Sequence, residues 1–192
     1  MRISPKYVAA DWIKIALCRE EDWKKAIEIF IDRLDGRFLR YIRQIEFKKY
    51  SGFVVMALDC LIIETLQQFY TGVQDTPIKK GRDYFITFLT RGTFGHFFTE
   101  DLANKFYHDI RNGILHQAEI KGSSKISIRT ELPLVNYTSD KKGIIVNRKL
   151  FHQNLLLELE DYVCRLKNQG EKELRNKFRR KMNYICQISR NK

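Results

Sequence analysis

The apolar residues between Thr99 and about Lys121 repeat at every fourth position, which predicts a helix with one buried side. The stripe consists of Leu102, Phe106, Ile110 and Ile114, and it is widened by Ala103, Tyr107 and Ala118. Such a side has to be buried against other elements, so the segment predicts a fold built from packed helices.

Other segments have the same helical spacing. They cover residues 22–46, 53–70, 82–89 and 148–168. Because residues 53–70 are apolar nearly all round, we expect them to form the central, most buried helix. The chain of 192 residues is long enough for one domain with a real core.

A change of pattern after Gly122 interrupts the helices. Residues 125–132 alternate between apolar and polar side chains, and residues 144–147 follow a polar turn at 139–143, which together predict a small β-hairpin. We therefore expect an all-α bundle with a β-hairpin insertion. It would be a single domain over residues 1–192, with a core at about 20–166 and a basic helix or tail at 170–192.

The polar side of the segment around residue 110 carries the chemistry. At about 100° per residue, the side opposite the stripe presents His108, Asn112, His116 and Glu119, together with Leu115. A leucine among polar residues suggests that a second surface covers this side. Gly113 costs about 1 kcal/mol in a helix interior but lets another backbone come close.

The separation of Arg111 and His116 limits what one helix can do. Five residues apart, the two side chains should point about 140° apart, with about 7.5 Å between them along the axis. We therefore expect one copy to make a poor pair. Two copies meeting around a symmetry axis could bring two arginines and two histidines into one cleft.

The run from Arg111 to His116 resembles the R-N-x-x-x-H signature of HEPN domains, small all-α nucleic-acid-related modules of bacteria and archaea. Residues 106–110 and 58–64 are also similar to stand-alone bacterial HEPN proteins, and the resemblance spans about residues 20–166. It implies a metal-independent RNase, without a cofactor, that dimerises to build one active site from two signature helices. The same arginine–histidine spacing recurs at Arg91 and His96, but in a glycine-rich connection where helical geometry is not expected.

RNA cleavage by the 2′-hydroxyl needs a base, an acid and a cation for the phosphate charge. We assign His116 as general acid/base, because an imidazole exchanges protons near neutral pH, and Arg111 as phosphate clamp, because its fork binds two oxygens. Asn112 would position these groups, and His108 would be an auxiliary substrate contact. The products would carry a 2′,3′-cyclic phosphate, and DNA would not be cut.

Two carboxylates interrupt the apolar segment 53–70. A buried carboxylate needs a partner, so Asp59 or Glu64 could support Arg111 or His116 from behind. Equally, either could be a capped or peripheral carboxylate without such a role.

A net charge of +12 and a pI near 9.6 favour polyanionic partners, RNA or DNA before an anionic membrane. The most basic cluster is in the tail, where we expect Arg175, Arg179 and Arg180 to contact nucleic acid; a solvated terminal helix is the alternative. The arginine row at residues 33, 37, 40 and 43 is more simply a solvated side partly neutralised by Asp32 and Asp35.

The cysteines show no C-x-x-C pair, no signal peptide pattern begins the chain, and the apolar run at 53–63 is too short for a bilayer. We therefore expect a cytoplasmic protein without a membrane partner. P-loop and zinc motifs are lacking in the sequence.

The resemblance implies, by analogy, a role in phage defence, stress or a toxin–antitoxin system, with an antitoxin or other regulatory protein as a further partner. The alternative is a non-catalytic HEPN-like module that binds nucleic acid, nucleotide or protein. Some family members are modified on a tyrosine two residues after the histidine; Ala118 stands there, a departure from that version. A DNA-binding regulator is a weaker option, because no recognition-helix pattern is present.

Overall fold

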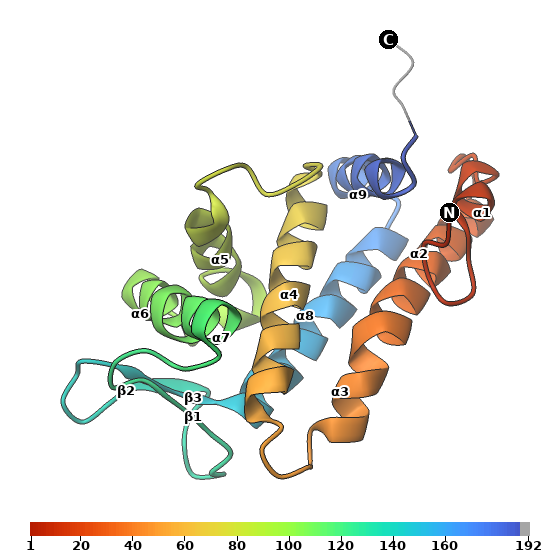
Figure 1. The fold of residues 1–192 in the computed structure, drawn as a ribbon. Coiled ribbons are helices and arrows are strands. Elements are labelled where there is room, and N and C mark those ends of the chain that lie inside the picture. Colours follow the sequence, from red (N-terminus) through yellow and green to blue (C-terminus); the bar gives the residue numbers. More distant parts are fainter. Residues whose placement is uncertain (189–192) are drawn as a thin grey trace. The chain divides into compact units, whose positions relative to one another are not determined.

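The computed structural model describes residues 1–188 and shows a mostly helical protein with one small sheet (Figure 1). Its contacts divide the chain into two compact units. Unit 1 comprises residues 1–45, 68–75 and 160–192, and unit 2 comprises residues 46–67 and 76–159. Two long helices, α4 (Gly52–Thr71) and α8 (Arg148–Lys167), contribute residues to both units. The expected single-domain organisation stays a prediction.

Unit 1 is built around aromatic side chains. Its elements include α1 (Ala9–Ile13), α2 (Glu20–Leu34), the π-helical segment η1 (Asp35–Leu39), α3 (Arg40–Ile45) and α9 (Lys172–Ile185). The rings of Phe30, Phe69, Tyr162 and Phe178 pack with centroids 4.8–6.4 Å apart, all fully buried. The expected long helix at 22–46 therefore exists as α2, η1 and α3 in succession.

The arginine row of this run is largely used inside unit 1. Arg33 and Arg37 donate to the backbone carbonyls of Ile3 and Arg2, and Arg43 pairs with Asp35 at 2.6 Å. The expected solvated side is therefore correct only in part: Asp35 neutralises Arg40 and Arg43, but Arg33 and Arg37 are half-buried and bind backbone carbonyls.

Unit 2 holds most of the remaining elements. They are α5 (Gly81–Leu89), the 3₁₀ turn η2 (Gly92–Phe94), α6 (Glu100–Lys105), the π-helical segment η3 (Phe106–Arg111), α7 (Asn112–Gln117) and the strands β1 (Lys125–Ser127), β2 (Val135–Tyr137) and β3 (Ile144–Asn147). Its core joins Phe94, Phe98, Phe106 and Phe151, with the last two rings stacked at 4.9 Å.

The helical run from Glu100 to Gln117 explains the every-fourth-residue stripe. Thr99 caps its start, because the side chain of Thr99 accepts a hydrogen bond from the Leu102 N–H at 3.3 Å. A regular α-helix turns by 3.6 residues, so a period of four would drift off one side; the wider π turn at η3 compensates that drift. Leu102, Phe106, Ile110 and Ile114 are accordingly all buried.

The sheet corrects the expected hairpin. Its order is β1-β3-β2, with β1 parallel to β3 and β2 antiparallel to it. The two segments that the sequence marks as strands therefore pair in parallel, and the antiparallel partner of β3 is the missed strand β2. That strand is only three residues long and follows Pro133, so it lacks a readable alternation.

Helix α4 corrects the expectation about membrane length. Its 20 residues are long and apolar enough to cross a bilayer by length and composition, although the apolar run within it looked too short. Half of its most apolar window is buried inside the protein, as in a core helix. Its two carboxylates also have partners within unit 2: Asp59 binds His152 and Glu64 binds Arg111.

Candidate functional site

Four polar side chains of unit 2 meet at the junction of η3 and α7. The guanidinium of Arg111 has Nη1 3.0 Å from Asn112 Oδ1 and 3.4 Å from His116 Nε2, and its Nη2 donates to Glu64 Oε2 at 3.0 Å. We call Arg111, Asn112, His116 and Glu64 the arginine cluster. It places a cation, a carboxamide and an imidazole within one hydrogen-bonded group.

The expectation that Arg111 and His116 are too far apart within one copy is wrong. Side chains of a helix lean toward its N-terminus, so the imidazole of His116 leans back toward the turn that carries Arg111. The long arginine side chain covers the remaining distance, and the two groups meet at 3.4 Å. Helical-wheel angles describe Cβ directions and ignore this reach.

Glu64 fixes the guanidinium from α4. Its Oε2 accepts from Arg111, while its Oε1 accepts from the hydroxyl of Thr76 at 3.1 Å. The Arg111 guanidinium also lies 5.7 Å from the Phe85 ring centroid and 5.5 Å from that of Tyr107. Only 16% of the Arg111 side chain is exposed, so its position is set on several sides.

The helix that carries the cluster is shorter at its C-terminal end than the sequence predicts. The helix ends at Gln117 instead of near Lys121, because Ala118 takes the left-handed conformation at φ 53° and the chain turns back. A Cβ on Gly113 would lie 2.4 Å from the Glu119 carbonyl oxygen, so the backbone that needs this glycine is the chain's own. Glu119 is therefore not part of the polar helix side.

His116 and Leu115 are exposed, Leu115 to 43%. His108 is exposed as well, but its Nδ1 lies 2.8 Å from Asp109 Oδ1, and among the described residues it makes no contact with the arginine cluster. Asp109 also accepts from the Ser124 hydroxyl, which ties the helix to the segment before β1.

The other carboxylate of α4, Asp59, does not bind Arg111 or His116 as proposed. Asp59 Oδ1 lies 2.8 Å from His152 Nδ1, and both side chains are buried. Burial raises the pKa of Asp59, against the hydrogen bond from His152. Burial lowers the pKa of His152, but the hydrogen bond and charge of Asp59 outweigh it, so this pKa is raised. Asp59 therefore supports His152 and not the arginine cluster.

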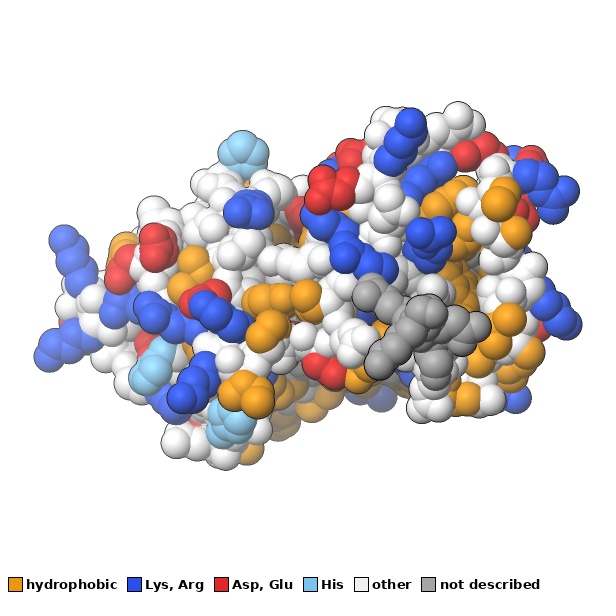
Figure 2. All heavy atoms as spheres, turned by 90° about the horizontal axis from the view of Figure 1, so that it is seen from above, with side chains coloured by type: hydrophobic (Ala, Val, Ile, Leu, Met, Phe, Trp, Pro, Cys, Tyr) orange, Lys and Arg blue, Asp and Glu red, His pale blue; other side chains and the backbone are white. Residues whose placement is uncertain are grey.

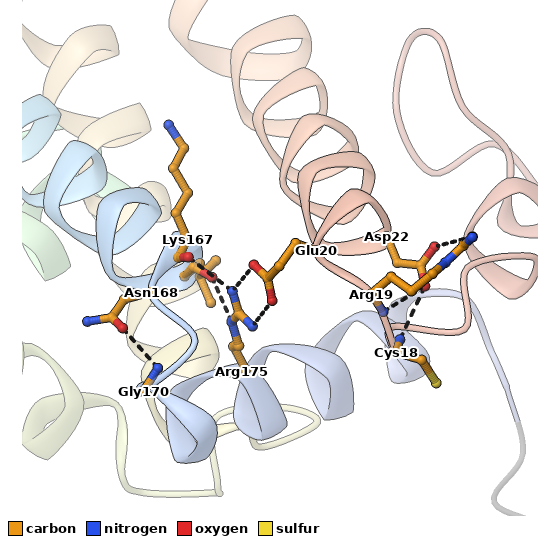
Figure 3. Close-up of polar contacts among 9 residues, drawn as sticks. Cys18, Arg19, Glu20, Asp22, Lys167, Asn168, Gly170 and Arg175 are labelled. Carbon is orange, nitrogen blue, oxygen red and sulfur yellow. Dashed lines mark hydrogen bonds and ion pairs between the residues drawn. The ribbon is translucent and has the colours of Figure 1, made fainter.

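Arg175 is not available to a substrate, which corrects its assignment as a nucleic-acid contact (Figure 3). Its two terminal nitrogens donate to both Glu20 oxygens at 2.9 Å, and its Nε donates to the Leu166 carbonyl at 2.9 Å. The amphipathic pattern of α9 turns this arginine inward, where its fork satisfies the carbonyls that end α8. The hydrogen bond from Arg175 also lowers the pKa of Glu20.

Arg179 and Arg180 are exposed on α9. Figure 2 shows lysine and arginine side chains on the viewed face, with acidic side chains also present. Of the three arginines assigned to this contact, Arg179 and Arg180 remain accessible, and their contact with nucleic acid stays a prediction.

The sequence missed several residues that the structure places at or near these groups. His152 lies on the apolar side of α8, where the sequence indicates only a core residue. Thr76 lies in a turn-rich connection, where the sequence indicates no contact. Phe85 and Tyr107 were recognisable only as apolar positions. No sequence signal pairs residues so far apart in the chain.

Among residues 1–188, no group of three or more histidine, cysteine or acidic side chains is placed to hold a metal ion. Metal independence stays a prediction. Comparison with protein families, curated proteins and solved structures finds no match to this chain.

Proposed function

We propose that the chain is a metal-independent endoribonuclease of the HEPN type that acts as a homodimer through the helix carrying Arg111 and His116. The arginine cluster is the observation that supports this most. Arg111 would bind the scissile phosphate, Asn112 would orient it, and the exposed His116 would exchange the proton.

The chemistry gives the reason for a second copy. Removing a proton from the 2′-hydroxyl and protonating the leaving 5′-oxygen are best done by two groups, a base and an acid. In the part of the chain that the structure describes, the arginine cluster contains one histidine. A two-fold axis beside the exposed His116 and Leu115 would supply the second histidine and cover the leucine.

For Arg111 to bind a phosphate, at least one of its terminal nitrogens must exchange its present hydrogen-bond partner for the substrate. Nη2 is held by Glu64, whereas among the described residues Nη1 has hydrogen-bond contacts with the neutral side chain of Asn112 and the imidazole. Nη1 is therefore the nitrogen on which a phosphate oxygen would replace the present partners. By analogy with HEPN toxins, the reaction would serve phage defence, stress or a toxin–antitoxin pair in the cytoplasm.

A cleavage assay on single-stranded RNA in the presence of EDTA tests this. We expect the wild type to cut RNA to 2′,3′-cyclic phosphate ends and to leave DNA intact, and His116→Ala to lower the rate by about 10²- to 10⁴-fold. Arg111→Lys keeps the charge but loses the fork, and should also be impaired.

The second arginine–histidine pair provides the control. Arg91 and His96 have the same spacing and are exposed, so Arg91→Ala and His96→Ala should cut RNA like the wild type. Cleavage that survives His116→Ala, or that needs a metal ion, would contradict the proposal. If the molar mass measured by light scattering shows that the active protein is a monomer, no cleft shared between two copies is needed for cleavage.

One observation favours a second candidate, the non-catalytic binding module. Arg111 is mostly buried and is held by Glu64, Phe85 and Tyr107, as expected of an arginine that joins helices. A folded wild type that binds RNA without cutting it, together with an unfolded Arg111→Ala variant, would favour this candidate.

A further inference from the structure

A groove of about 630 Å³ lies in unit 2, away from the residues of the arginine cluster in sequence. It is formed by the loop before α4, the end of β1 and the start of α8. Its basic side chains are Lys48, Lys49, Arg129, Arg148 and Lys149. We call it the basic groove.

The charge of the basic groove is not balanced. Glu46 is its one acidic lining residue, and among the described residues none of the five cations forms an ion pair within 4.0 Å. The large groove of unit 1 differs, because four acidic residues, Glu20, Glu28, Asp32 and Asp35, line it beside its cations. An excess of unpaired cations in a concave site attracts a polyanion.

Two aromatic rings stand at this groove largely in solvent. Phe47 is 80% exposed and Tyr50 is 86% exposed, and Lys49 Nζ lies 4.9 Å from the Tyr50 ring centroid. Tyr50 also has φ 65°, a conformation that is strained for a bulky residue and that persists only where the surroundings enforce it. A ring that is this exposed contributes nothing to the core of its own unit.

The loop that carries the rings is anchored from below. Arg148 is buried, and it donates through Nη1 to the Ser51 hydroxyl at 3.1 Å and through Nη2 to the Glu46 carbonyl at 2.8 Å. The side-chain amide of Asn147 donates to the Arg129 carbonyl at 2.9 Å, which holds the opposite wall. Both walls are thus fixed by neighbouring residues of one chain segment, so the groove is preformed.

We propose that the basic groove binds single-stranded nucleic acid, with phosphates on Lys48, Lys49, Arg129 and Lys149 and bases stacked on Phe47 and Tyr50. Cations that follow a backbone together with exposed rings are the two elements by which proteins hold single strands without reading their sequence. A membrane surface would also take lysines and aromatics, but a bilayer is too flat to enter a concave groove that is lined on two sides. Binding of this kind does not depend on whether the strand is cut.

Fluorescence anisotropy with a 12-nucleotide 2′-O-methyl oligouridine tests binding alone, because this strand lacks the 2′-hydroxyl nucleophile. We expect Phe47→Ala and Tyr50→Ala each to weaken binding by about five- to hundredfold. Lys48→Gln with Lys49→Gln should lower the salt dependence of log affinity by about 0.7 for each phosphate that the protein no longer neutralises.

Matched variants elsewhere separate the groove from net charge and exposed rings. Lys141→Gln with Lys142→Gln removes the same charge from an exposed turn, and Tyr41→Ala removes a ring that is 50% exposed; both should bind like the wild type. Equal losses in the groove and control variants would overturn the inference. So would groove variants that bind the strand normally but lose binding to anionic phosphatidylserine vesicles. An unmodified RNA strand that binds in the same assay and is never cut would leave this inference intact while contradicting the proposed nuclease activity.

Discussion

Two carboxylates on α4, five residues apart, hold two different basic partners within unit 2. Asp59 is fully buried and binds His152, which is buried too. Glu64 is 27% exposed and binds Arg111, whose guanidinium also meets the exposed His116. Both acids have the same apolar surroundings in the sequence, yet one pair is closed and the other is open to solvent at one end.

This difference in exposure suggests that the buried pair serves stability and the exposed pair serves the proposed reaction. A buried ion pair costs desolvation and leaves an uncompensated charge when one partner is lost, so it controls folding. A pair that ends on an exposed imidazole can change partners without unfolding the chain, as a substrate-binding group must. We therefore expect substitutions at Asp59 to change stability and substitutions at Glu64 to change activity.

The largest effect should follow Asp59→Ala. This variant leaves His152 buried without its acceptor, and we expect a loss of about 3–5 kcal/mol in the free energy of unfolding. Urea denaturation followed by circular dichroism measures it. Glu64→Ala is the matched variant on the same helix and should cost less, because water reaches that pair. Equal losses would mean that the two pairs contribute alike to stability.

The helices could be predicted from the sequence, because apolar spacing reports which side of a helix is buried. The π turn at η3 was not predicted, although it explains why Leu102 and Ile114, twelve residues apart, are buried on one side. The strand pairing could not be predicted, because alternation along a strand does not say which other segment it pairs with or in which direction.

The candidate site was predictable in its local part only. Arg111, Asn112 and His116 lie in one run, but their distance depends on side-chain reach, which a wheel projection leaves out. The pairing of Arg111 with Glu64 and of Arg175 with Glu20 depends on packing between segments that are far apart in the sequence. The sequence alone does not distinguish the two arginines. In the structure, the guanidinium of Arg111 contacts an exposed histidine, whereas that of Arg175 binds Glu20.

A smaller effect, confined to activity, should follow Glu64→Gln. The amide oxygen can still accept from Arg111, while the amide NH₂ would donate to the Thr76 hydroxyl. The side chain no longer carries the charge that fixes the guanidinium, so RNA cleavage should fall by up to about 10²-fold through misplacement. Steady-state cleavage rates compared with Asp59→Asn, at a temperature where both variants are folded, measure it. If Asp59→Asn lowers the rate as much, the distinction between the open and closed pairs fails.

The smallest effect is a pH dependence that belongs to the closed pair alone. The pKa of His152 is raised in the folded protein, because the hydrogen bond and charge of Asp59 outweigh its burial. A raised histidine pKa stabilises the fold fully below the ordinary value of about 6.5, and this stabilisation is lost as pH rises through the folded value. The free energy of unfolding should therefore decrease above about pH 6.5, and His152→Asn, which keeps a donor toward Asp59 without titrating, should flatten that decrease. If the decrease is as steep in the His152→Asn variant as in the wild type, the closed pair is not its source and the prediction is contradicted.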